Sequence, residues 1–123
     1  MQYWAYGDFG QFSYNLQASD KYLVEANTLF AYNQYVLALD ALEKSNSFYT
    51  KVKPALVSAR IHHKDIQAKS DLLKQAAKAH ITVLTHLEKE LPSTFVWEEE
   101  NQKPQILPLH SDIQDAIHLR EAL

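Results

Sequence analysis

The sequence predicts an all-α protein: an antiparallel three-helix bundle, with an extended strap and a short C-terminal helix packed on it. Three observations indicate this fold. Apolar residues recur at helical spacing nearly throughout the chain before Pro92, short breaks divide the periodic stretches, and both glycines lie within the first ten residues. A chain of 123 residues with 46% hydrophobic residues can bury a core as one domain, residues 1–123, without disulfides or metals.

The first helix is expected at about residues 11–32, with Asp8 or Ser13 as its N-cap. Its apolar stripe recurs at alternating spacings of three and four and consists of Phe12, Leu16, Ser19, Leu23, Ala26 and Phe30. Asn33 tolerates the left-handed conformation that ends many helices. The break after it is short, so the next helix is predicted to fold back antiparallel.

The second helix is expected at about residues 35–63, because one apolar stripe continues from Tyr35 to His63. A proline inside a helix removes a hydrogen bond and costs about 3 kcal/mol or more. Pro54 therefore predicts a kink near Thr50, with the helix continuing beyond it. Residues 62–65 are expected to form the second turn, with Asp65 as the next N-cap.

The third helix is expected at about residues 66–91 and ends before Pro92. Its inward side is predicted to consist of Ile66, Leu73, Ala77, His80, Leu84, Leu87 and Leu91. Residues 92–110 have no helical period and are expected to form the extended strap. Ser111 and Gln114 match a capping box, which predicts the last helix at about residues 112–122.

Composition excludes several classes of site. The chain has no cysteine, which excludes a thiolate nucleophile, a cysteine-ligated zinc and a disulfide framework. Phosphate-binding loops need several glycines, and the chain has only Gly7 and Gly10. No apolar run approaches the ~20 residues of a membrane span. The net charge of −3 argues against a generally basic nucleic-acid binder.

The six histidines do not form a recognisable metal motif. Di-metal sites in bundles need repeated Glu-x-x-His pairs, and the nearest match is a single pair, Asp115 and His118. His80 falls on the apolar stripe, where a hydrogen-bonded core histidine is the favoured interpretation. We therefore expect no cofactor, no metal and no catalytic residues, and a single apolar seam shared by the three helices, with no pocket chemistry inside it.

Positive charge gathers between Lys51 and Lys78, around the turn between the second and third helices. In an antiparallel bundle this turn lies beside the start of the first helix, with its aromatic residues Tyr3, Trp4, Tyr6 and Phe9. Aromatic residues beside cations suit an anionic membrane surface, although ordinary solvated faces explain the lysines as well. The candidate contacts with an anionic surface are Lys51, Lys53, Arg60, Lys64 and Lys69.

Two resemblances involve the same helices. The turn Asn33-Gln34-Tyr35 and the following Ala38-Leu39 and Leu42-Glu43-Lys44-Ser45 resemble the turn and second helix of a tetratricopeptide repeat, although no second copy follows. Residues 14–92 resemble an uncharacterised bacterial helical family, a domain of unknown function found in membrane-anchored or secreted envelope proteins. That likeness is carried by Tyr22-Leu23-x-Glu25-Ala26, Ala38-Leu39-x-x-Leu42, His80-x-x-Val83-Leu84 and Leu91-Pro92. It implies a location in the cell envelope and no catalytic residues.

The expected function is a non-enzymatic interaction or spacer domain of a bacterial envelope protein, with an unidentified protein partner. Phe95 and Trp97 in the strap are the candidate partner contacts, alongside their expected role in pinning the strap to the bundle. The alternative is a helical nucleic-acid-binding or ribonuclease-like module that uses the basic region Lys51–Lys78. The ribonuclease pattern needs a histidine roughly four to six residues after an arginine; none stands there after Arg60, and Arg120 lies too near the end of the sequence to supply it.

Overall fold

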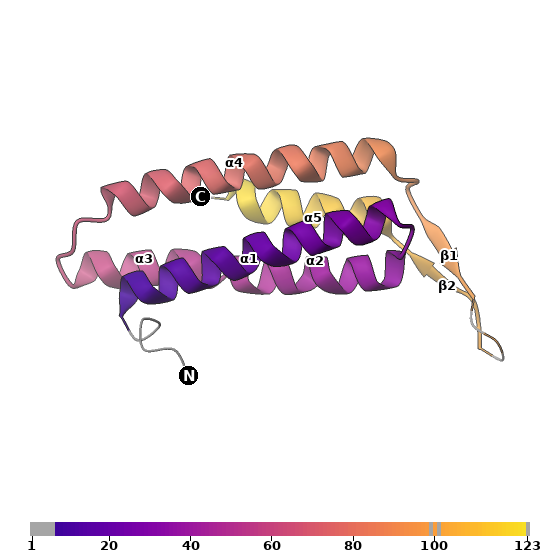
Figure 1. The fold of residues 1–123 in the computed structure, drawn as a ribbon, viewed down its shortest axis with the longest axis horizontal. Helices are drawn as coiled ribbons and strands as arrows, with labels where there is room; N and C mark the ends of the chain where they lie inside the picture. Colours follow the sequence, from indigo (N-terminus) through magenta and orange to yellow (C-terminus); the bar gives the residue numbers. More distant parts are fainter. Residues whose placement is uncertain (1–6, 99, 101, 123) are drawn as a thin grey trace.

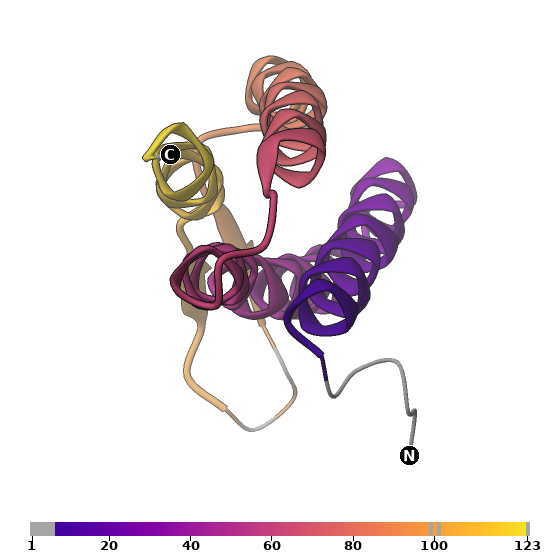
Figure 2. The same ribbon diagram turned by 90° about the vertical axis from the view of Figure 1, so that its left-hand side faces the viewer.

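The computed structural model describes residues 7–98, 100 and 102–122, and it is mostly helical, as predicted. Its elements are α1 (Asp8–Ala31), α2 (Tyr35–Tyr49), α3 (Val52–Ile61), α4 (Gln67–Glu90), β1 (Phe95–Trp97), β2 (Gln105–Leu107) and α5 (Leu109–Glu121). In Figure 1, α2 and α3 follow one another along one side of the molecule, while α1 and α4 are long rods beside them. Figure 2 looks along these rods and shows α1 and α5 on opposite sides of the bundle.

Each of the two predicted turns between helices contains a residue in the left-handed backbone conformation. Asn33 has φ 60° and His63 has φ 62°. At the first turn the Asn33 N–H donates to the Phe30 carbonyl and the Gln34 N–H to the Leu29 carbonyl, which satisfies two carbonyls at the end of α1. The prediction of side-chain capping at the start of α1 is wrong, because Gly7 occupies the N-cap and makes no side-chain bond.

The prediction of one long second helix is wrong, because the helix divides into α2 and α3. Thr50 and Lys51 keep right-handed helical dihedrals, but the Lys51 N–H bonds to Phe48, one residue nearer than in an α-helix. The break lies where the kink was expected. Pro54 falls in the first turn of α3, where its missing N–H would have had no helical partner.

The strap and the last helix also differ from expectation. Residues 95–97 and 105–107 pair as antiparallel strands, with Phe95 opposite Leu107, instead of running as an unpaired strap. Side chains alternate along a strand, so Phe95 and Trp97 face inward while Val96 stays exposed. The capping-box prediction fails because α5 begins at Leu109, after Pro108, and Ser111 lies inside its first turn.

The core consists of two hydrophobic clusters, one at each end of the bundle. The first lies near the hairpin and includes Leu23, Leu42 and Leu84, the three residues expected to share one core. The second lies near the α3–α4 turn and includes Phe12, Val52, Leu56 and Leu73. Helix α5 contributes the fully buried Leu109, Ile113 and Ala116 to the first cluster. The C-terminal helix is therefore a fourth member of the bundle core rather than an addition to three helices.

Replacement of Leu42 by alanine tests the packing of the first cluster. Leu42 is 2% exposed, so Leu42→Ala leaves a cavity in the first cluster and is expected to lower the free energy of unfolding by about 2–5 kcal/mol. Leu37 lies on the same helix but is 55% exposed, so Leu37→Ala is the matched control. We expect it to change the free energy of unfolding by less than about 1 kcal/mol. Urea unfolding measures both. Equal losses for the two variants would contradict this core.

Candidate functional site

A layer of polar side chains separates the two hydrophobic clusters. Each of the four rods supplies one buried polar residue at this level: Ser19 from α1, Ser45 from α2, His80 from α4 and Arg120 from α5. Their hydrogen bonds join residues far apart in the chain, including Arg120 to Ser45 and Ser19 to Ser45. The expected single apolar seam is therefore divided into two clusters, and we call the group of polar side chains between them the polar layer.

Arg120 is the centre of the polar layer and is fully buried. Its Nε donates to Nδ1 of His80 at 2.9 Å, and its two terminal nitrogens donate to Oδ1 of Asn46 at 2.7 Å and to Oγ of Ser45 at 2.9 Å. A further bond reaches the Ala116 carbonyl, one turn earlier in α5. The guanidinium also lies over the Tyr49 ring, 5.0 Å from its centroid. Arg120 thus connects α5 with α2 and α4.

Burial lowers the pKa of Arg120 to about 10. Even at that value the guanidinium carries its positive charge at neutral pH. Within the described part of the chain no carboxylate lies within ion-pair distance of it, although the charge of Asp20, which pairs with Nε2 of His80, favours its charged form. A buried charge without a direct ion pair depends on hydrogen bonds for its stabilisation.

The bond from Arg120 fixes the tautomer of His80. Nδ1 of His80 accepts from Arg120, so the ring proton lies on Nε2, which donates to Oδ1 of Asp20. Both ring nitrogens are occupied and the residue is 5% exposed. His80 is therefore a hydrogen-bonded core histidine, as predicted, and neither nitrogen is free to take a proton from a substrate.

Two serines hold α1 and α2 close together. Oγ of Ser19 donates to the Ser45 carbonyl at 2.9 Å, and Oγ of Ser45 donates to the Ser19 carbonyl at 2.7 Å. Both side chains are fully buried. Small residues that bond to the facing backbone allow two helices to approach closely, which positions Ser45 to accept from Arg120.

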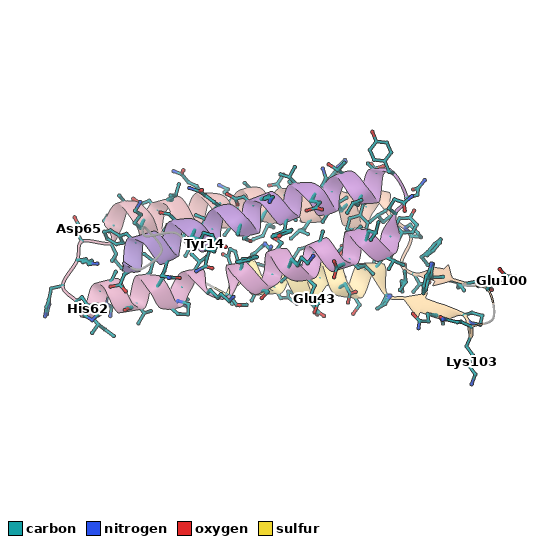
Figure 3. All side chains as sticks on the ribbon, turned by 60° about the horizontal axis from the view of Figure 1, so that its bottom comes forward. Tyr14, Glu43, His62, Asp65, Glu100 and Lys103 are labelled. Atoms are coloured by element: carbon teal, nitrogen blue, oxygen red, sulfur yellow. The ribbon has the colours of Figure 1, made fainter. Side chains whose placement is uncertain are left out.

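A cleft of about 410 Å³ opens between α2 and α5 at the hairpin end of the bundle, and we call it the acidic cleft. Val36, Leu39, Leu42 and Leu107 give it an apolar floor, and four carboxylates, Asp40, Glu43, Asp112 and Asp115, line its sides. Figure 3 shows Glu43 on the outer surface of α2. Burial raises the pKa of Asp112, and the nearby charges of Asp115 and Glu43 raise it further. The cleft therefore favours positive charge.

A second groove, of about 190 Å³, lies between α3 and α4, and we call it the basic groove. Leu56, Val57, Ile66 and Leu73 form its apolar part, and Lys53, Arg60 and Lys74 surround it. None of these three cations lies within ion-pair distance of a carboxylate in the part of the chain that the structure describes. Val57 is half exposed beside them.

The five cations proposed for an anionic surface lie in three places. Lys53 and Arg60 border the basic groove, whereas Lys64 pairs with Asp8 at 3.6 Å and its ammonium lies over the Phe9 ring. Lys69 lies over the same ring, and Lys51 over Phe48. The start of α1 does meet the α3–α4 turn, as expected, but Tyr3, Trp4 and Tyr6 lie outside the described residues. His62 and Asp65 mark this turn in Figure 3.

The two proposed partner contacts in the hairpin are both partly buried. Phe95 packs edge-on against Tyr35, with ring centroids 4.7 Å apart, and Trp97 lies on the same side of the strand. These contacts join the hairpin to the start of α2. The exposed apolar residues of the hairpin are instead Val96 and Ile106, which face each other across the strand pair.

Among residues 7–98, 100 and 102–122, no group of three or more histidines and carboxylates is arranged to hold a metal ion. In the same residues no helix combines the length and the apolar character needed to cross a bilayer. The sequence matches no protein-family model, and comparison with curated proteins and with solved structures gives no match.

The polar layer can be tested by removing its central cation. Arg120→Met leaves Nδ1 of His80 buried without a donor, and we expect it to lower the free energy of unfolding by about 1–3 kcal/mol in urea. The matched control is Arg60→Met, at the only other arginine. Its free energy of unfolding in high salt is expected to stay within about 0.5 kcal/mol of that of the native chain.

The double variant Arg120→Met, His80→Leu removes both partners of the central bond. We expect it to be less destabilised than the sum of its single variants, because no buried acceptor is left unpaired. Strict additivity of the two substitutions would show that the bond between Arg120 and His80 does not couple α5 to α4.

Proposed function

We propose that this chain is a non-enzymatic helical interaction domain, and that its acidic cleft holds a basic, amphipathic segment of a partner protein. The observation that carries this proposal is the combination of an apolar floor with four carboxylates in one cleft of about 410 Å³. A segment that presents leucine-like and lysine-like side chains on one face would bury the former on the floor and neutralise the carboxylates with the latter.

The electrostatics of Asp112 support a cationic occupant. Its pKa is raised by burial and by two neighbouring carboxylates, so ionisation of this group is disfavoured in the free protein. A positive group in the cleft would stabilise the ionised form. Part of the binding free energy would therefore come from relief of repulsion among Asp112, Asp115 and Glu43.

Support for a non-enzymatic role comes from the polar layer. Its ionisable groups are held inside the bundle by one another, with Arg120 fully buried and both His80 nitrogens bonded. Such a layer specifies how the rods pack rather than presenting groups to a substrate. The further proposal that the domain belongs to a bacterial envelope protein rests on the resemblance of residues 14–92 alone.

A second candidate function is suggested by the basic groove. Lys53, Arg60 and Lys74 converge there without carboxylate partners in the described structure, which favours an anionic ligand. The nucleic-acid alternative would use this groove. This alternative predicts that the protein binds single- or double-stranded oligonucleotides with an affinity that falls steeply as salt rises. The double variant Lys53→Glu, Arg60→Glu should lose this binding.

Binding of a synthetic helical peptide tests the acidic cleft. We expect a peptide with leucine and lysine at helical spacing to bind, as measured by calorimetry, and Glu43→Lys to weaken it roughly tenfold because one attraction becomes a repulsion. The matched control is Glu25→Lys, on an exposed position of α1. The same peptide with glutamate in place of lysine should not bind. Equal affinity for both peptides would refute the proposed function.

The pKa of Asp112 provides a second, independent test of whether the peptide binds in the acidic cleft. Its folded pKa lies above the model-compound value of 3.8, so its burial disfavours folding at neutral pH, and this penalty is relieved as the pH falls through the folded pKa. In a carboxyl-detected NMR titration, Glu43→Gln should lower the pKa of Asp112, because one of the negative charges that raise this pKa is removed. The lysine-containing peptide should lower it as well. A pKa that stays unchanged on peptide addition would place the peptide elsewhere.

A further inference from the structure

We propose that the basic groove, together with a smaller pocket beside it, is the binding site of a medium-chain carboxylate. The smaller pocket has a volume of about 160 Å³, and we call it the terminal pocket because residues at the end of α5 line it. Its lining consists of Tyr49, Thr50, Lys53, Leu73, Leu119 and Ala122. This inference goes beyond the proposed function, because it concerns a different surface and a different class of ligand.

The basic groove and the terminal pocket are two parts of one depression, which we call the extended groove. Lys53 and Leu73 line both parts, so the two adjoin. Figure 1 shows the end of α5 partway along α4, and Leu119 and Ala122 border the extended groove at that point. Beyond it the lining comes from α3 and the start of α4. The extended groove therefore lies where α5 no longer covers the core.

The walls of the extended groove suit an alkyl chain. They are formed by six aliphatic side chains, those of Leu56, Val57, Ile66, Leu73, Leu119 and Ala122. A cavity of about 150 Å³ with aliphatic walls binds a molecule as large as benzene, so pockets of this size accept part of an alkyl chain. Unpaired bases of nucleic acids bind by stacking on aromatic rings, and Tyr49 is the one aromatic residue in the described lining. The lining thus favours an alkyl chain over a nucleic acid.

Three cations along the extended groove favour a negatively charged head group. Lys53 belongs to α3 and Lys74 to α4, so they border the basic groove from opposite sides, and Arg60 lies further along α3. All three residues are exposed, and none pairs with a carboxylate of the described structure. Lys53 borders both parts of the extended groove, which places its charge at their junction. A carboxylate at this junction would be attracted by an ammonium group beside apolar walls.

The hydroxyl of Tyr49 is an unused hydrogen-bond donor beside this junction. The residue is 5% exposed, and its hydroxyl is buried without a hydrogen-bond partner among the residues that the structure describes. The Tyr49 ring contacts Arg120 and also lines the terminal pocket. Burial raises the pKa of the hydroxyl, which therefore keeps its proton at neutral pH and can donate. A carboxylate oxygen in the terminal pocket would accept this bond while its charge lies near Lys53.

The length of the basic groove sets the chain length of the ligand. With the carboxylate between Tyr49 and Lys53, the alkyl chain runs along α3 toward Arg60. Lys53 and Arg60 lie seven residues apart, about 10 Å at the helical rise, which an extended octanoate chain spans. Its methylenes would cover Val57, which is half exposed in the free protein. A longer chain would continue past Arg60 into water and gain little from the added methylenes.

Calorimetric titration of the full chain with straight-chain carboxylates tests this site. Affinity should rise about fourfold for each methylene from butanoate to octanoate, because each methylene leaves water, and should level off for longer chains. Octanol has the alkyl chain without the carboxylate, so we expect it to bind at least tenfold more weakly than octanoate. In NMR spectra of the native chain, octanoate should shift the signals of Val57 and Ser70, which line the basic groove.

Two substitutions test the contacts with the head group. Tyr49→Phe should weaken octanoate binding about fivefold without lowering the melting temperature, because a buried hydroxyl without a partner adds no stability. Lys53→Met should weaken octanoate about tenfold and octanol little, because it removes the charge and keeps an unbranched side chain. The matched control is Lys21→Met on α1, which lies on the opposite side of the bundle from α5. Unchanged octanoate affinity in both Tyr49→Phe and Lys53→Met would overturn the assignment.

Three other results would overturn this inference: no saturable octanoate binding at millimolar concentration, an affinity independent of chain length, or equal binding of octanol. An oligonucleotide that binds the native chain and not Lys53→Met, where octanoate does not bind, would assign the basic groove to nucleic acid instead. The acidic cleft is tested separately. The lysine-containing peptide should bind Lys53→Met as well as it binds the native chain, and its failure to bind either would reject the proposed function alone.

Discussion

The fold depends on one buried cation. Arg120 donates to acceptors on α2 and α4 and to its own helix, and its partners Ser45 and His80 extend the network to α1. Hydrophobic packing is non-directional and tolerates rods that slide or rotate. A buried guanidinium does not tolerate such sliding or rotation, because each of its donors must keep an acceptor. A buried charge without hydrogen bonds is strongly disfavoured. The polar layer therefore fixes how the rods align.

The alignment imposed by the polar layer explains the position of α5. Leu109, Ile113 and Ala116 pack in the cluster near the hairpin, while Arg120, one turn further on, reaches the layer between the clusters. Because Arg120 anchors its end, α5 lies beside α2 over the length that forms the acidic cleft. The internal layer and the external cleft are thus connected, since the same helix takes part in both.

The surfaces on the α2–α3 rod differ because different helices cover its two halves. Helix α5 lies beside α2 and brings Asp112 and Asp115 to Asp40 and Glu43, whereas α4 lies beside α3 and adds Lys74 to Lys53 and Arg60. Each set of like charges surrounds an apolar floor. Val36 at the acidic cleft and Val57 at the basic groove remain in contact with water, which is the physical reason to expect an interaction role.

The sequence by itself determined the mostly helical fold, the turns at Asn33 and at residues 62–65, and the burial of three long apolar stripes, because these follow from local spacing and backbone preference. It also identified His80 as a core histidine. Only the tertiary structure decided that residues 95–97 pair with 105–107 and that Pro54 opens a separate helix. The burial of Arg120 and the joining of Glu43 with Asp112 were equally beyond local pattern, since each depends on residues more than sixty positions apart in the chain meeting in space.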